Sequence, residues 1–166
     1  MIATIDFEAS SMKGYPIEVG VAIFDPARPY LSLWSSLIKP TVQWLQTISW
    51  DPVAAQMHGI ARADLTNAQS AFDVGRQLNT LLAPIGVAYC DGWKWDHRWL
   101  FLLMEECPEP CAFQLSDAGA LGRALGIRPS ALFERENEAP LDHRAVSDAE
   151  RLLRRALRLA GSDCRP

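Results

Sequence analysis

Three apolar segments of strand length occupy the first forty residues, and they constrain the fold more than any other feature of the sequence. Residues 1–8, 17–25 and 30–40 are rich in the β-branched, aliphatic and aromatic residues that favour strands. A turn sequence with two prolines, residues 26–29, separates the second segment from the third. Because consecutive strands joined by short links pair antiparallel, the beginning of the chain predicts an antiparallel meander.

The remainder of the chain alternates between helical and strand patterns. Apolar residues at helical spacing predict helices or helical turns at residues 52–58, 61–66, 70–83, 95–106, 116–125 and 145–160. Short apolar runs predict strands at residues 87–90 and 112–115, and the charged, proline-bearing residues 128–142 predict a loop. We therefore expect an α/β fold with a central mixed five-stranded sheet and flanking helices, and the first strand near the sheet centre.

Length and composition indicate a single globular domain over residues 1–166. Apolar residues make up 49% of the chain and charged residues 22%, a balance that supports a packed core. No apolar run approaches the roughly 20 residues of a membrane helix. No basic region precedes the first strand, so we expect no signal peptide and a cytoplasmic location. Cys107 and Cys111 lack the second pair that a zinc site needs, so we expect idle thiols.

Two acids interrupt the first apolar strand. Because side chains alternate along a strand, Asp6 and Glu8 share one face of it, about 6.6 Å apart along the chain. Ile5 and Phe7 take the opposite face. Neighbouring carboxylates repel each other and a divalent cation removes that repulsion, so the pair fits half of a metal site. A strand end open to solvent would explain the two acids without a metal.

Three further polar residues complete a candidate constellation. Asp96 begins a predicted helix directly after the buried strand 87–90, and the ends of such strands are where α/β sheets build their sites. Its alternative role is a helix N-terminal acid that stabilises the helix dipole. His143 lies where the loop meets the last helix, five residues before Asp148. A histidine beside a metal site is a natural proton acceptor, although a histidine at a helix start can also be a cap or surface residue.

These motifs, in their order along the chain, resemble the three motifs of the DEDD 3′–5′ exonucleases. The matching stretches are IDFEAS at residues 5–10, DHRWL at residues 96–100 and HRAVSDAE at residues 143–150. The H-x4-D spacing resembles the histidine subclass, DEDDh, which includes proofreading exonucleases, oligoribonuclease and RNase T-like enzymes. Residues 57–60, MHGI, also resemble that family's His-Gly-Ile segment. The resemblance extends from Ile2 to about Leu159 and implies a ribonuclease-H-like fold.

The resemblance also implies a role for each of the five residues. Asp6, Glu8 and Asp148 would hold a first metal ion. Asp6 would bridge to a second ion, which Asp96 would help to hold through water, and His143 would accept a proton from the attacking water. The implied cofactors are two Mg²⁺ ions, for which Mn²⁺ can substitute, and oxygen ligands suit both. Two ions about 3.5–4 Å apart would stabilise the attacking and leaving oxygens of an in-line displacement at phosphorus.

One position departs from the family pattern and bears on substrate binding. Family members usually carry Asn four residues before the middle acid, where this chain has Gly92. We expect Asp91 beside it to face away from the phosphate or to bond the backbone. Stacking of a base on Trp93 would replace the substrate contact that the family's Asn makes. An extended turn at residues 93–95 would place Trp95 on the same side as Trp93. His58 would line the pocket for the terminal nucleotide, or else serve only the local turn.

The last predicted helix carries an arginine face. Helical spacing places Arg151, Arg154, Arg155 and Arg158 on the side opposite its apolar residues. This face could contact a phosphate backbone, but a solvated surface is the simpler interpretation. Trp99, one turn into its helix, is expected in the core.

The combined features predict a metal-dependent 3′–5′ exonuclease that acts on single-stranded ends of DNA or RNA. The net charge of −4 argues against a large electrostatic grip on nucleic acid but permits a small acidic site that recruits metal ions. Two alternatives stay open, a metal-dependent hydrolase of small phosphodiesters or nucleotides and a nucleic-acid-binding module with weak activity. No membrane partner is expected, a homodimer is compatible with the sequence, and the residues do not distinguish DNA from RNA.

Overall fold

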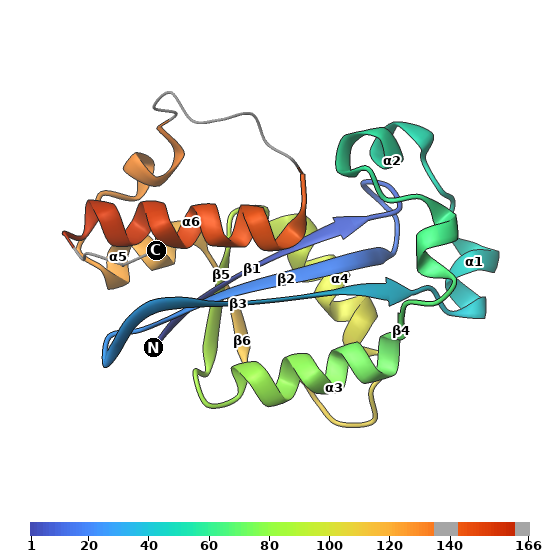
Figure 1. The fold of residues 1–166 in the computed structure, drawn as a ribbon, viewed down its shortest axis with the longest axis horizontal. Helices are drawn as coiled ribbons and strands as arrows, with labels where there is room; N and C mark the ends of the chain where they lie inside the picture. The colour runs from blue at the N-terminus through green and yellow to red at the C-terminus, as the bar shows by residue number, and fades with distance from the viewer. Residues whose placement is uncertain (135–142, 162–166) are drawn as a thin grey trace.

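The computed structural model describes residues 1–134 and 143–161 and contains one mixed sheet with the strand order β4-β3-β2-β1-β5-β6 (Figure 1). The six strands are β1 (Ile2–Ala9), β2 (Pro16–Asp25), β3 (Arg28–Lys39), β4 (Gln69–Ser70), β5 (Val87–Cys90) and β6 (Gln114–Asp117). The helices are α1 (Val42–Thr47), α2 (Pro52–His58), α3 (Ala71–Leu82), α4 (Trp93–Met104), α5 (Ala118–Ala124) and α6 (Ala145–Leu159). Two 3₁₀ helices span Arg62–Leu65 and Pro129–Phe133.

The α/β fold class, the antiparallel meander and the central position of the first strand are confirmed. β1 pairs with β2, and β2 with β3, in antiparallel register, while β5 lies parallel to β1 and β6 parallel to β5. The predicted strand count of five is wrong by one, because β4 adds a two-residue parallel pairing to the end of β3. Two residues are too few to carry a period that a sequence pattern could reveal.

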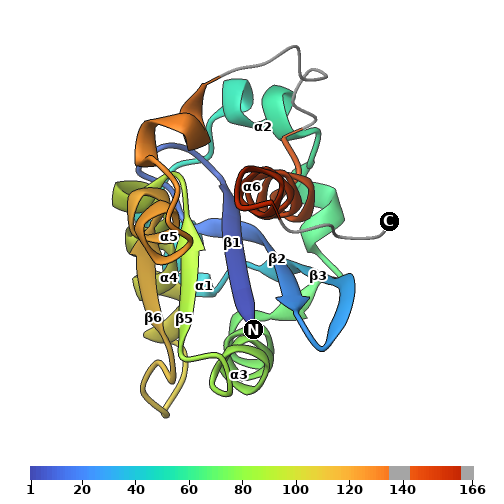
Figure 2. The same ribbon diagram turned by 90° about the vertical axis from the view of Figure 1, so that its left-hand side faces the viewer.

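Helices cover both faces of this sheet. The side of β1 that carries Ile5 and Phe7 packs against α3 and α4, with Leu78 and Trp99 in the same apolar cluster, so the core position of Trp99 is confirmed. The other side packs against α6, where Leu153 belongs to a second cluster that includes residues of β2. Figure 2 shows the strands in a row, with α6 and α3 on opposite sides. The strand alternation predicted for β1 therefore directs its acids toward α6.

The connection of β5 to α4 determines where the candidate residues meet. Because β1 and β5 run parallel, their carboxyl ends lie at the same edge of the sheet. Asp6 and Glu8 lie toward that end of β1, and Asp91 and Asp96 follow β5. The last helix reaches the same edge with its first turn, and a buried hydrogen bond of 2.6 Å from Thr4 Oγ1 to the Ala149 carbonyl ties it to β1. Three separate parts of the sequence thus converge.

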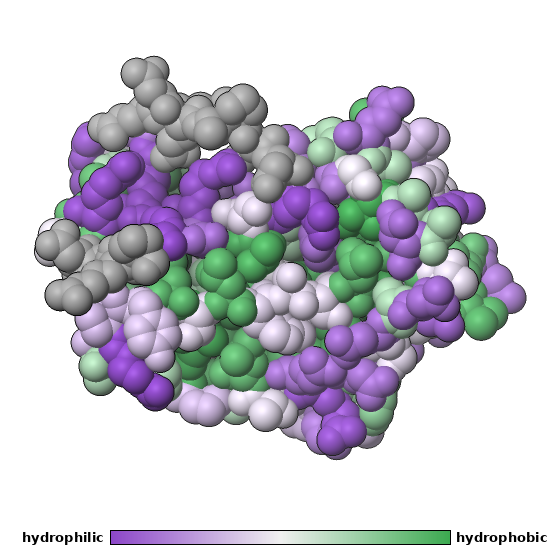
Figure 3. All heavy atoms as spheres, viewed as in Figure 1, coloured by the Kyte–Doolittle hydropathy of each residue, from purple (hydrophilic) through white to green (hydrophobic). Residues whose placement is uncertain are grey.

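The molecular surface is mixed in polarity. On the face shown in Figure 3, apolar residues gather in a band between α6 and α3, where β3 crosses in Figure 1. No described helix is both long enough and apolar enough to cross a membrane. Cys90, Cys107 and Cys111 are free thiols. The predicted loop 128–142 contains the second 3₁₀ helix, and its residues 135–142 lie outside the described part of the chain.

Candidate active site

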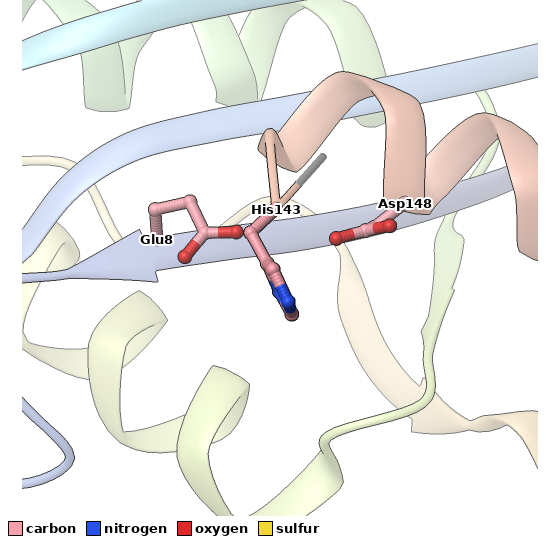
Figure 4. Close-up of side chains that lie close together, drawn as sticks. All are labelled: Glu8, His143 and Asp148. Carbon is pink, nitrogen blue, oxygen red and sulfur yellow. The ribbon is translucent and has the colours of Figure 1, made fainter. Parts of the chain in front are cut away.

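The side chains of Glu8, His143 and Asp148 meet at the carboxyl end of β1. Each offers one potential ligand atom, and these atoms all lie within 4.8 Å of one another. Figure 4 shows the His143 ring between the Glu8 carboxylate from β1 and the Asp148 carboxylate from α6. The three residues come from the first and third sequence motifs, which are separated by more than a hundred positions in the chain. The fold thus brings these motifs into one site.

A second group of carboxylates lies beside the first. Potential ligand atoms of Asp6, Asp91 and Asp96 also lie within 4.8 Å of one another. One surface pocket has Asp6, Glu8 and Asp91 in its lining, together with His143 and Asp148. All four motif acids and the histidine are therefore assembled around one place, with Asp96 buried beneath it.

Asp96 owes its position to the first turn of α4. Its side chain is buried, and its Oδ2 accepts a hydrogen bond of 3.1 Å from the backbone N–H of Gly92, the N-cap residue. The alternative role, an acid at the helix N-terminus, therefore also applies. A Cβ atom on Gly92 would lie 2.9 Å from Asp96 Oδ2, too close for an ordinary contact. A side chain at this position would therefore require the Asp96 carboxylate to shift.

Asp91 meets one of the two expectations stated for it, because its carboxyl group takes part in hydrogen bonds with the backbone at Asp91 and Gly92. It also lies in the pocket lining and close to Asp6 and Asp96, a place that was not expected. The rule that pointed to Asp96 could have found it, because Asp91 directly follows the carboxyl end of β5. The described site therefore contains a carboxylate beyond the four of the motifs.

Four of these carboxyl groups have raised pKa values, and for Asp91 burial is the main cause. Burial, and after it the charges of Asp96 and Asp91, raise the pKa of Asp6 well above its usual value. Burial and the charge of Asp148 raise the pKa of Glu8 to about 8. Burial and the charge of Asp91 raise the pKa of Asp96 to about 7. A divalent cation would relieve this repulsion, and oxygen donors with one imidazole suit such an ion, so the residues present fit a metal site.

His58 has the local role that was considered for it. The ring is buried, and its Nδ1 accepts a hydrogen bond of 3.0 Å from the Ile60 N–H. This bond bridges Gly59, which ends α2 in a left-handed conformation with φ of 68°. Burial lowers the pKa of His58, which favours the neutral ring that accepts such a bond. His58 does not belong to the lining of the carboxylate pocket, so a contact with a nucleotide stays a prediction.

The tryptophans near Asp96 do not share one side. Residues 93–95 form the first turn of α4 and not an extended turn, so the expectation for Trp95 is wrong. Two positions along a helix are about 200° apart around its axis. Trp93 is 43% exposed, and its ring centroid lies 5.3 Å from that of His97. Trp95 stacks on Trp99 with centroids 6.4 Å apart. Trp93 alone of this pair is exposed enough to receive a base.

The arginines of α6 do not form a single solvated face. Arg155 is buried, with a hydrogen bond of 3.2 Å from its Nε to the Ala131 carbonyl, so its predicted outer position is wrong. Arg151 and Arg155 both belong to the pocket lining. Arg151 Nη1 lies 3.3 Å from Asp148 Oδ1. The helical period places residues 148, 151 and 155 on one side of the helix, and this side faces the pocket because α6 packs along the sheet.

Solved structures match the chain over nearly its whole length, although no protein-family model and no curated protein sequence matches it. Exonuclease X in complex with 5′ overhanging duplex DNA matches with a TM-score of 0.61 and 18% sequence identity, over 99% of this chain and 95% of that one. The nuclease domain of 3′hExo, a DEDDh family member bound to rAMP, matches with a TM-score of 0.68 and 16% identity, over 98% and 92%.

A third match is the zinc-ion-bound form of an E. coli ExoI–ssDNA complex, with a TM-score of 0.67 and 12% identity. It covers 95% of this chain and 40% of that one. TM-scores of 0.61 to 0.68 establish a shared fold, and sequence identities of 12% to 18% establish no more than that. The chain has the ribonuclease-H-like fold of these exonucleases, as the motif resemblance implied.

Proposed function

We propose that residues 1–166 form one exonuclease domain, a metal-dependent 3′–5′ exonuclease that hydrolyses phosphodiester bonds from the 3′ ends of single-stranded DNA or RNA. One observation carries this proposal. The acids and histidine of three distant motifs, drawn from β1, the first turn of α4 and the start of α6, lie in the lining of one pocket or directly beside it. The fold around them is shared with structures of 3′-exonucleases.

The proposed cofactors are two Mg²⁺ ions, with Mn²⁺ as a substitute. Asp6, Glu8, Asp96 and Asp148 would hold them, and the raised pKa values of Asp6 and Glu8 support this, because protons and cations relieve the same repulsion. When bound, such ions stabilise negative charge on the attacking and leaving oxygens at phosphorus.

The histidine and the arginines would complete the reaction. His143 would accept a proton from the water that attacks phosphorus, and the bond from phosphorus to the 3′-oxygen would break. The products are a nucleoside 5′-monophosphate and a chain one nucleotide shorter with a free 3′-hydroxyl. Arg151 and Arg155, which line the pocket, would attract the phosphate.

Binding of the terminal nucleotides is proposed from the aromatic residues. Trp93 would stack on a base, since its ring is exposed at the start of α4. His58 would lie along the terminal nucleotide, near the end of α2. A nucleic-acid substrate is in keeping with the related folds, which include Exonuclease X with 5′ overhanging duplex DNA and ExoI with single-stranded DNA.

A substrate panel tests this proposal against its two alternatives. The panel contains 5′-labelled single-stranded oligomers of DNA and RNA, the same oligomers with a 3′-phosphate, a circular single strand and small phosphodiesters. We expect stepwise shortening from the free 3′ end, slow cleavage of the blocked oligomers and survival of the circle. Faster turnover of the small phosphodiesters would identify a small-molecule hydrolase. Tight binding of oligomers without cleavage would identify a binding module.

A further inference from the structure

The first turn of α6 is capped by a residue from another part of the chain. Arg144 occupies the N-cap position, and its side chain makes no capping hydrogen bond. The backbone N–H of Ala145 instead donates a hydrogen bond of 3.1 Å to Oε2 of Glu18, a residue of β2 that is 127 positions earlier in the sequence. A carboxylate at this place also interacts favourably with the positive end of the helix dipole. Glu18 thus takes the role that a Ser or Asp at the N-cap normally has.

Arg144 holds the same carboxylate from the side. Its Nε donates a hydrogen bond of 3.0 Å to Oε2 of Glu18, and its Nη2 donates to Oε1. The side chain of Glu18 is only 2% exposed, whereas that of Arg144 is 44% exposed. A buried carboxylate is tolerated where it is paired and hydrogen-bonded. The bidentate contact with Arg144 neutralises the charge of Glu18 and also fixes the orientation of its carboxylate. Glu18, Arg144 and the Ala145 N–H form one unit, which we call the α6 clamp.

The α6 clamp lies directly opposite the motif acids of β1. In the β1–β2 ladder, Glu18 is the partner of Glu8, and Gly20 is the partner of Asp6. A Cβ atom on Gly20 would lie 2.1 Å from the backbone nitrogen of Val146, so the first turn of α6 rests on the bare backbone of β2. Residues 18 and 20 point to the same face of the strand. Together they seat α6 beside the pair of acids.

His143 immediately precedes this clamp and has an unusual backbone conformation. Its φ is 49°, and it is the sole non-glycine residue with positive φ in the described ranges 1–134 and 143–161. Such a conformation is uncommon for a non-glycine residue and persists where the surroundings impose it. The clamp fixes the two residues that follow, Arg144 and Ala145. It thereby restricts where the His143 ring can lie between Glu8 and Asp148.

We propose that Glu18 and Arg144 are positioning residues that act through His143. Their ion pair holds the imidazole in the place from which it accepts the proton of the attacking water, and this rests on the proposed function of the site. A displacement of about 1 Å in a reacting group can cost about 100-fold in rate. Loss of the clamp is therefore expected to lower kcat by about 10- to 100-fold and to leave KM nearly unchanged.

A double-mutant cycle with His143 tests the proposal. We choose Arg144→Gln because its side chain is partly exposed, and Glu18→Gln as a second variant of the same unit. Arg144→Lys keeps the positive charge but loses the two-pronged contact, so it too should lower kcat. Arg154→Gln is the matched control, since it breaks an ion pair of 2.6 Å with Glu150 on the same helix.

The expected result is strong non-additivity. Arg144→Gln and Glu18→Gln should each lower kcat about 10- to 100-fold in the wild-type background and less than about threefold when His143 is already alanine. Mn²⁺ affinity, measured by calorimetry, should change little, and the control should retain wild-type kcat. Hydrogen exchange gives a readout without turnover, because the Ala145 amide should exchange faster in Glu18→Gln than in the wild type.

Other outcomes separate this proposal from the proposed function. Equal losses of kcat in both backgrounds, or a fall in Mn²⁺ affinity that accounts for the loss, would mean that the clamp supports the fold or the metals and does not act through His143. Wild-type kcat in all three clamp variants would also overturn the positioning role. If His143→Ala itself were as active as the wild type, the role of His143 would fall, and the positioning proposal would fall with it.

Discussion

The carboxyl groups around the pocket differ from ordinary surface acids in their protonation. Burial and like charges raise the pKa of Glu8 from 4.5 to about 8 and that of Asp96 from 3.8 to about 7. At a pH between the ordinary pKa and the raised pKa of each group, the folded protein retains a proton that the unfolded chain releases. The free energy of unfolding contributed by these groups is therefore fully present below the unfolded pKa and is lost as the pH rises through the folded pKa.

This linkage predicts an uncommon pH dependence of stability. In chelator at constant ionic strength, the thermal midpoint should fall as the pH rises from about 5 to about 8. Mg²⁺ at pH 8 should restore it, because bound ions replace the lost protons. Glu8→Gln should flatten the slope, and Glu109→Gln, at an exposed position, should leave it unchanged. A midpoint that rises steadily over this range in chelator would contradict the raised pKa values.

Substitutions at the site should separate metal binding from proton transfer. Asp6→Asn and Asp148→Asn should lose Mn²⁺ affinity and nuclease activity together, because each removes the charge of a proposed ligand. His143→Ala should keep Mn²⁺ affinity and lose about 10²- to 10⁴-fold in kcat, the usual contribution of a general base. Calorimetry and single-turnover cleavage of a labelled oligomer measure the two quantities. Nearly wild-type cleavage by His143→Ala would show that the histidine has a structural role only.

Trp93 should contribute to substrate binding and not to chemistry. Trp93→Ala should raise KM for an oligonucleotide roughly tenfold, as expected for the loss of one stacked base, and leave Mn²⁺ affinity unchanged. Phe101→Ala is the matched control, an exposed aromatic further along α4 that lies outside the carboxylate pocket. A large fall in thermal midpoint for Trp93→Ala would show that this ring supports the fold.

At the scale of elements, the strands and long helices were predictable because their signals are local. Alternation along β1 correctly assigned its two acids to one face, and helical spacing located α6 to within one residue at its end. β4 was missed because it has two residues, and α1 because its start depends on a hydrogen bond from the Trp44 N–H to Thr41 Oγ1. The seating of α6 on β2 could not be predicted, since it joins residues 126 positions apart.

The contact between α6 and β2 gives a prediction for the element as a whole. Gly20→Ala should push α6 off the sheet, because the added Cβ would lie 2.1 Å from Val146 N. We expect a loss of about 1–3 kcal/mol in the free energy of unfolding, measured by urea titration, and a larger proportional loss of nuclease activity. Ser35→Ala, at the exposed β3 position that pairs with Gly20, should change the free energy by less than about 0.5 kcal/mol. Equal stability of both variants would contradict the close contact.

At the scale of the whole molecule, the fold makes one site from residues that are far apart in sequence. The order of the motifs sufficed to predict the fold and to identify five candidate residues that the structure brings together. It did not predict that Asp91, Arg151 and Arg155 line the pocket. The orientation of these side chains depends on how α4 and α6 pack against the sheet. Local patterns specify which residues form each element, and packing decides which of the remaining side chains reach the pocket.

The most direct test of the central claim is cleavage of a 5′-labelled single-stranded oligomer by the metal-stripped protein, followed on a sequencing gel. The account predicts no cleavage in chelator, and a ladder that shortens from the 3′ end when Mg²⁺ or Mn²⁺ is restored. Asp148→Asn should form no ladder under the same conditions. Full activity in excess chelator, or internal cuts that appear before the 3′ end shortens, would contradict a metal-dependent 3′–5′ exonuclease.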